Sequence, residues 1–203
     1  MTIDREDLIN SIIESLGRIH HIGLDDIPNI DLYMDQVTTF MESRLKSTTR
    51  NPDEDKILTK TMINNYAKNN LLPPPVKKKY SKEHILLLIF IYYYKGILSI
   101  NDIQTLLGPL TEKYFHTPSR ELNLGTIYEE VFSLEKEEIM DLQKDIEKKF
   151  STSQKTFKDA PENDKEILQL FSFISMLSYD VYVKKLLIEK MIDSFKTATT
   201  IEK

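Results

Sequence analysis

The 203-residue sequence contains no cysteine, which excludes disulfide bonds, thiolate nucleophiles and zinc sites built on cysteine. Glycine is also scarce, with five residues, whereas lysine, isoleucine, leucine and asparagine are abundant. This composition favours a soluble, helical fold over a sheet-rich one. The length allows one large domain or a small domain with an extension, and we expect the second.

Long apolar runs are also lacking. The most apolar stretch, Ile85–Tyr94, has about ten residues between Lys82 and Lys95, roughly half of what a membrane span requires. The N-terminal segment MTIDREDLINSII carries acidic residues where a signal peptide has a basic region. We therefore expect a cytoplasmic protein without membrane contact, in which Ile85–Tyr94 is a buried core helix.

Motifs of enzymes are missing as well. The sequence has no Gly-rich phosphate loop and no nucleophile elbow, and its four histidines lack the spacing of a metal-binding set. Carboxylates such as Glu129, Glu130, Glu137 and Glu138 are expected on a solvated helix face. We therefore expect no enzymatic activity, no metal site and no cofactor.

Charge is distributed unevenly along the chain. Residues 1–58 carry 6 basic and 12 acidic side chains, and residues 108–203 carry 14 and 18. Residues 59–107 carry 7 basic and only 2 acidic side chains. Only this middle segment has a net positive charge, which favours a polyanionic partner there.

Helical spacing of apolar residues begins near the N-terminus. A first helix is predicted over about Asp4–Ile19, and Asp31 is predicted to cap a second helix that carries Leu45 on its apolar face. The segment Ser47–Asp55 lacks apolar residues and contains a proline, so an exposed loop is predicted there.

The third predicted helix, Thr59–Asn69, has two distinct faces. Met62, Ile63 and Tyr66 are predicted to point inward. The outer face at i, i+3, i+4 and i+7 comprises Thr61, Asn64, Asn65 and Lys68. Three prolines at 73–75 then favour an extended connection.

Two capped helices follow. Ser81 is predicted to cap a nearly all-apolar helix that runs through Tyr94 and ends at Gly96. Ser99 and Asp102 form a capping pair that is predicted to open a short fifth helix.

Longer helices are predicted in the C-terminal part. One covers about Thr126–Phe150, with a stripe of Ile127, Val131, Leu134, Leu142, Ile146 and Phe150. After the polar linker STSQKTFKDAPEN, another covers about Asp164–Lys196. The last helix is apolar on more than one face, so it is either buried centrally or used for dimerisation.

A longer stretch, TMINNYAKNNLLPPPVKKKYSKEHILLLIFIYYYKGILSINDIQTLL, resembles the winged helix-turn-helix of MerR-type regulators. The matching residues are Ile63, Tyr66, Leu71, Leu72, Pro73, Pro74, Tyr80, Ser81, Ile89, Ile91, Ser99, Ile100, Ile103, Leu106 and Leu107. LTKTMINNY and PPPVKKKYSKEHI are still more similar to an uncharacterised bacterial family of unknown function, number 1836, regarded as MerR-like. Asn70 replaces the usual turn glycine and tolerates the left-handed conformation second best.

The resemblance implies an all-α fold with at most a minimal β wing. It implies an N-terminal helix over residues 1–30, a winged helix-turn-helix domain over 31–110 and a helical dimerisation region over 111–203. By the same resemblance, residues 126–196 join two protomers through an antiparallel helix, giving a homodimer. The sequence identifies no effector.

Double-stranded DNA is the partner that this reading predicts. Asparagine can bond adenine bidentately, threonine can meet thymine, and lysines neutralise phosphates, so helix Thr59–Asn69 is placed in the major groove. The predicted DNA-binding residues are Lys60, Thr61, Asn64, Asn65, Lys68, Lys77, Lys78 and Lys79.

Plainer interpretations remain open. A lysine triplet is usually a solvated turn, and a Thr/Asn/Lys helix face is usually an ordinary exposed surface. The wing is short, and Asn64 stands where MerR-type proteins carry arginine. The alternative function is therefore a helical protein-interaction module that keeps the winged-helix scaffold without binding DNA. Separately, the alternative to dimerisation is that the C-terminal helices complete a monomeric core with the N-terminal helix.

Overall fold

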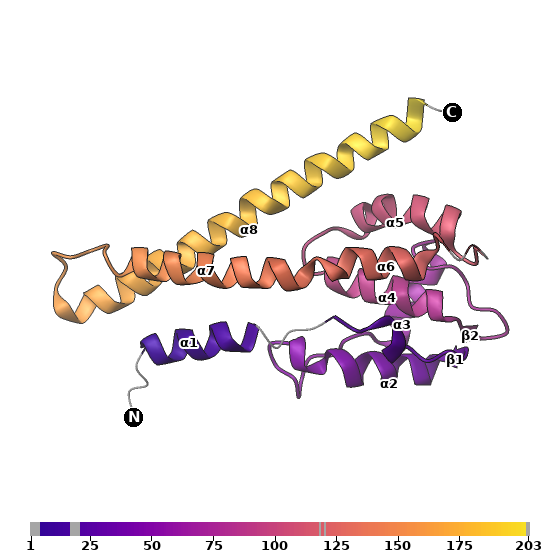
Figure 1. Ribbon diagram of the computed structural model, residues 1–203, viewed down its shortest axis with the longest axis horizontal. Helices are drawn as coiled ribbons and strands as arrows, with labels where there is room; N and C mark the ends of the chain where they lie inside the picture. Colours follow the sequence, from indigo (N-terminus) through magenta and orange to yellow (C-terminus); the bar gives the residue numbers. More distant parts are fainter. Residues whose placement is uncertain (1–4, 17–20, 118, 120, 202–203) are drawn as a thin grey trace. The chain divides into compact units, whose positions relative to one another are not determined.

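The computed structural model describes residues 5–16, 21–117, 119 and 121–201 (Figure 1). The chain is mostly helical, with one two-stranded antiparallel sheet, which confirms the predicted all-α class with minimal β-structure. It folds into two compact units, which we call the hairpin unit (residues 1–20 and 133–188) and the core unit (21–132 and 189–203). Within the described ranges, no helix combines the length and apolar content needed to cross a bilayer.

The core unit contains most of the secondary structure. Its elements are η1 (Leu24–Asp26), β1 (Leu32–Tyr33), α2 (Met34–Leu45), η2 (Lys46–Thr48), α3 (Lys60–Lys68), β2 (Lys79–Tyr80), α4 (Lys82–Tyr94), α5 (Ile100–Tyr114), α6 (Leu124–Ser133) and the end of α8 (Glu162–Ile201). The sheet pairs Leu32 with Tyr80 and Tyr33 with Lys79. Two segments that are 46 residues apart in sequence therefore meet.

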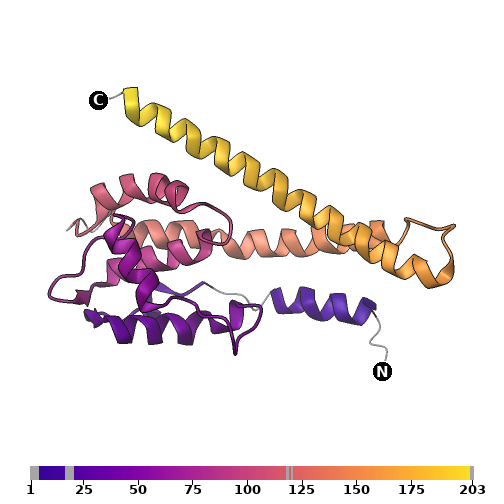
Figure 2. The same cartoon turned by 180° about the vertical axis from the view of Figure 1, so that it is seen from behind.

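Helix α4 forms the centre of the core unit, between α2 and α5 in both views (Figures 1 and 2). All eight side chains from His84 to Ile91 are buried, which confirms the predicted core helix. A helix that is apolar around its whole circumference must be covered on every side. The aromatic rings of Phe90, Tyr128 and Phe132 continue this core toward α6.

The fifth helix begins as predicted, because Ser99 Oγ accepts a hydrogen bond from the Asp102 amide at 3.2 Å. It is not short, however, and runs 15 residues through Pro109 to Tyr114. Leu110 and Tyr114 pack on the core, and this packing outweighs the hydrogen bond that a proline removes from the helix.

Two other predicted helix boundaries are wrong. Asp31 does not cap α2, because the backbone just before that helix pairs with β2, and Tyr33 becomes the N-cap. The predicted helix Thr126–Phe150 breaks at Leu134 into α6 and α7 (Glu135–Ser153), close to the boundary between the two units. Its predicted apolar stripe is also wrong in α6, where the buried residues are Leu124, Tyr128 and Phe132.

The hairpin unit consists of α1 (Arg5–Leu16), α7 and the part of α8 up to residue 188. The ends predicted for the first helix, Asp4 and Ile19, lie outside the described residues. The Gln169 amide donates to the carbonyls of Gln154 and Thr156, at 2.9 and 3.2 Å, and so closes the turn between α7 and α8. The predicted last helix is confirmed and extends over Glu162–Ile201.

Candidate nucleic-acid interface

Helix α3 presents the predicted polar face to solvent. Thr59 Oγ1 caps its first turn by accepting from the Met62 amide at 3.1 Å. Ile63 and Tyr66 are buried, and they anchor the helix to the core. The exposed residues on the other side are Thr61, Asn64, Asn65 and Lys68. The inward and outward faces are therefore as the sequence predicted.

Asn70 ends this helix in the left-handed conformation, with φ 57°. The amides of Leu71 and Leu72 both donate to the Tyr66 carbonyl, at 2.9 and 3.1 Å. This turn carries both leucines directly into the core. The expected left-handed turn at Asn70 is therefore confirmed, and asparagine suits this position because it tolerates the conformation better than most other side chains.

The lysine triplet forms a tight two-residue hairpin, which we call the 76–79 hairpin. Val76 and Lys79 exchange both backbone hydrogen bonds, at 3.0 and 2.9 Å. The two residues between them, Lys77 and Lys78, have φ angles of 50° and 66°. Positive φ at both central positions defines a turn that normally selects Asn-Gly. Each lysine is therefore held in a conformation that costs about 1–2 kcal/mol.

Strand pairing attaches this hairpin to the start of α2. Tyr33 pairs with Lys79, whose Nζ lies 5.2 Å from the centre of the tyrosine ring. Tyr33 is 53% exposed, so an aromatic face lies beside the lysines. Sequence reasoning missed this residue, because a two-residue strand has no detectable periodicity.

The N-terminal end of α3 lies at the same end of α2. Lys60 forms an ion pair with Asp35, two residues beyond Tyr33. The structure therefore gathers the start of α3 and the 76–79 hairpin around the first turn of α2. Among the predicted DNA-binding lysines in the described part of the chain, only Lys60 forms an ion pair with a carboxylate.

Acidic side chains also surround the start of α3. A hollow of about 320 Å³ lies there, and its charged lining residues are Glu42, Asp53, Glu54 and Asp55 with the lysines Lys56 and Lys60. Asp53 lies 3.9 Å from Lys46. The positive segment of the sequence is therefore not a uniformly positive surface, because the fold returns acidic residues from the preceding loop to it.

The long connection between α2 and α3 is fastened to α4. Lys95 Nζ donates to the Ile57 carbonyl at 2.6 Å, and the Tyr92 and Thr48 hydroxyls lie 2.6 Å apart. Burial lowers the pKa of Lys95 below its ordinary value. These contacts hold the ends of the connection, so the α2–α3 pair has a defined geometry despite the length of its loop.

Comparison with known proteins adds one match. The model of a family described as Domain of unknown function (DUF1836) matches residues 22–131. This range coincides with the continuous part of the core unit, which includes α3 and the 76–79 hairpin. Neither a curated protein nor a solved structure matches the chain.

Proposed function

The chain belongs to the DUF1836 family, and on that premise we propose that it is a DNA-binding transcriptional regulator of MerR-like type. In this proposal α2 and α3 act as the helix-turn-helix, and the 76–79 hairpin acts as a minimal wing. Helix α3 reads the major groove, and the wing lysines contact the adjacent phosphates.

The geometry of the 76–79 hairpin is the observation that carries this proposal. Two exposed lysines occupy positions where Asn-Gly would fold more easily. Backbone strain of this kind concentrates at functional sites, because selection retains it where the side chains are needed. Two cations at the tip of a hairpin beside an exposed polar helix suit a phosphate backbone.

The outer face of α3 supplies groups that read bases. Asn64 and Asn65 are exposed and each has an amide that matches the adenine edge, and Thr61 can contact a thymine methyl group. Lys68 at the other end of this face can contact phosphate. With Lys60 paired to Asp35, about four lysines remain, which predicts that the logarithm of the association constant falls with the logarithm of the salt concentration with a slope of about −3.6.

A second copy of the chain is the proposed partner for α8. In the hairpin unit the exposed apolar residues of this helix are Ile167, Phe171, Ile174, Tyr179, Val181, Tyr182, Val183, Leu186, Leu187 and Ile188. Ten side chains, each about half exposed, present on the order of 900 Å² of apolar surface per chain. A stable interface buries about 800 Å² per partner, so this surface is large enough for a dimer. Dimerisation would also present two α3 helices to a two-fold DNA site.

Fluorescence anisotropy with a pool of random-sequence duplexes, measured across a salt series, tests DNA binding. We expect binding that weakens steeply with salt, and a slope reduced by about three when Lys77, Lys78 and Lys79 are changed to alanine. A control variant replaces the exposed lysines Lys148, Lys155 and Lys158 of the hairpin unit by alanine. No binding at low salt would refute DNA recognition and leave the protein-interaction module as the better interpretation.

Light scattering after size exclusion tests the dimer separately. We expect twice the chain mass of 23.8 kDa, and the monomer mass for the Phe171→Asp, Ile174→Asp variant. Ser175→Asp is the matched control, because this exposed serine lies on the same helix outside the apolar set. A wild-type mass of one chain at all concentrations would contradict the dimer.

A further inference from the structure

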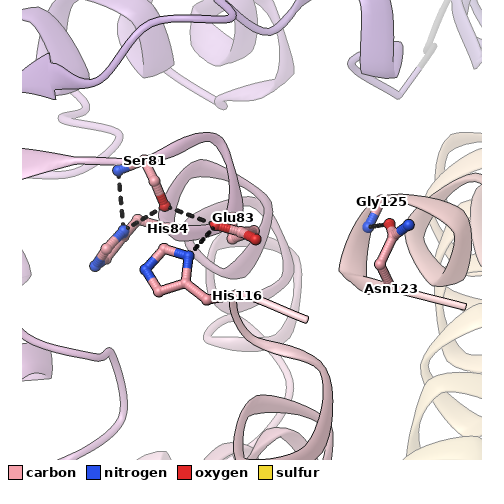
Figure 3. A network of polar contacts seen from close by, with 6 residues as sticks. All are labelled: Ser81, Glu83, His84, His116, Asn123 and Gly125. Carbon is pink, nitrogen blue, oxygen red and sulfur yellow. Dashed lines mark hydrogen bonds and ion pairs between the residues drawn. The ribbon is translucent and has the colours of Figure 1, made fainter. Parts of the chain in front are cut away.

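A partly buried polar cluster joins the start of α4 to the turn after α5 in the core unit. It comprises Ser81, Glu83, His84 and His116 (Figure 3). The Ser81 amide donates to His84 Nδ1 at 3.0 Å, and the Ser81 hydroxyl donates to Glu83 Oε2 at 3.0 Å. His116 Nδ1 lies 2.7 Å from the same carboxylate oxygen. One carboxylate therefore serves both the serine and the second histidine.

His84 is the centre of this cluster and is only 1% exposed. Because its Nδ1 accepts from the Ser81 amide, its proton is on Nε2. Among the described residues Nε2 has no hydrogen-bond partner of good geometry. Burial lowers the pKa of His84, His116 lowers it further, and the Pro73 and Pro74 backbone and Glu83 offset part of the effect.

The ring of His84 packs edge-on against two rings besides that of His116. One is Tyr80 of β2, with centroids 5.4 Å apart, and the other is Phe115, at 4.8 Å. Tyr80 directly follows the 76–79 hairpin and pairs with Leu32, so His84 supports the base of the hairpin. His116 follows α5 in a left-handed conformation, φ 58°, which orients its ring toward Glu83.

We propose that the Ser81–Glu83–His84–His116 cluster is a proton-sensitive clasp that holds the 76–79 hairpin against α4 and releases it on acidification. A proton on Nδ1 can be donated to the Ser81 hydroxyl oxygen, which lies 2.9 Å away, but it removes the acceptor for the Ser81 amide and places a charge in a buried site. The titratable groups that face His84 are Glu83 on α4, His116 after α5 and Tyr80 on β2. Glu83 favours the charged form of His84, but its effect is smaller than that of burial, so the closed clasp still disfavours the second proton.

The direction of the pH effect follows from linkage. The pKa of His84 is below its ordinary value of about 6.5 in the closed clasp and returns to that value when the clasp opens. The closed state is therefore fully favoured above about pH 6.5 and loses stability as the pH falls below it. At pH 5.5 opening is therefore more favoured than at neutral pH, with an upper limit of about tenfold that is set by the ordinary pKa of the open state.

Amide hydrogen exchange of Val76 and Lys79, corrected for intrinsic rates, measures the opening. We expect exchange to accelerate between pH 7.5 and 5.5 in the wild-type chain, by up to about tenfold. His84→Gln keeps an acceptor for the Ser81 amide but does not titrate, so the acceleration should disappear. His116→Gln removes the second histidine but leaves His84 and its bond from the Ser81 amide, so it should still show acceleration at low pH.

Three results would overturn the proposal: no acceleration in the wild type, acceleration that persists in His84→Gln, or acceleration lost in His116→Gln. Imidazole 15N chemical shifts in the unmodified chain give an independent reading. They should report a neutral Nε2–H tautomer at neutral pH, and titration like that of a solvent-exposed histidine would contradict the clasp.

The consequence for DNA rests on the proposed function. Release of the hairpin should weaken binding at pH 5.5 in the wild type more than in His84→Gln, as measured by anisotropy. Hydrogen exchange requires no DNA, so a chain that binds no DNA but shows the pH-dependent opening would refute the regulator and support the clasp.

Discussion

Left-handed backbone positions are where single residues of this chain determine its turns. The non-glycine residues with positive φ among the described positions are Asn70, Lys77, Lys78, His116 and Phe157, and no described glycine has positive φ. Such conformations cost about 1–2 kcal/mol for most side chains. This glycine-poor sequence therefore makes its tight turns with residues other than glycine, at a cost in conformational energy.

The turn lysines give the residue-scale prediction. Lys77→Asn with Lys78→Gly should raise the free energy of unfolding by about 1–2 kcal/mol, because these residues prefer the turn conformation. The same variant should bind DNA more weakly, with a salt slope reduced by about two. Urea denaturation and anisotropy measure the two effects.

The double alanine variant of these lysines separates charge from strain. Lys77→Ala with Lys78→Ala removes both charges but keeps unfavourable φ angles, so it should weaken DNA binding without stabilising the fold. Equal stabilisation by the two variants would show that conformational strain at this turn is negligible.

Tertiary contacts, more than local propensity, determine where the elements begin and end. Tyr128 shows this for α6, because it is fully buried and its hydroxyl donates to the Ile22 carbonyl at 2.6 Å. This bond fastens α6 to the segment just before η1, 106 positions away. The predicted stripe through Val131 and Leu134 fails because the core requires the other face of the helix.

Removing this hydroxyl gives the element-scale prediction. Tyr128→Phe should lower the free energy of unfolding by about 1–2 kcal/mol, because the buried Ile22 carbonyl loses its partner while the ring packing stays. Urea denaturation measures the change. Tyr179→Phe, at a tyrosine that is 67% exposed, should have almost no effect, and equal losses in both variants would contradict this explanation.

The fold places acidic side chains beside the one segment of the sequence that has a net positive charge. The chain has a net charge of −5, and the fold brings Glu42, Asp53, Glu54 and Asp55 around the start of α3. In the proposed complex these carboxylates would repel phosphate groups and so limit nonspecific attraction to DNA. Tight binding would then be limited to DNA sites whose base contacts with α3 offset this repulsion.

Neutralising part of this acidic group gives the whole-molecule prediction. Asp53→Asn with Glu54→Gln should raise DNA affinity severalfold at low salt, and the gain should shrink as salt is added. The control changes Asp141 to asparagine and Glu147 to glutamine on α7, both exposed and in the hairpin unit. Anisotropy across a salt series compares them, and an unchanged affinity in the first variant would place the start of α3 outside the DNA interface.

Much of the local structure follows from the sequence alone. The all-α class, the buried α4, the capped start of α5, the two faces of α3 and the turn at Asn70 were all predictable. Each of these depends on residues within about one or two helical turns of one another, where side-chain spacing and backbone preference act directly.

The features that only the tertiary structure decided depend on residues that are far apart in the chain. These include the pairing of Tyr33 with Lys79, the ion pair of Lys60 with Asp35 and the burial of His84 beneath the hairpin. A linear pattern of hydrophobicity or charge carries no information on which distant segments meet. The sequence therefore determined which residues face outward on α3, whereas packing around α4 determined which charges and rings stand beside them.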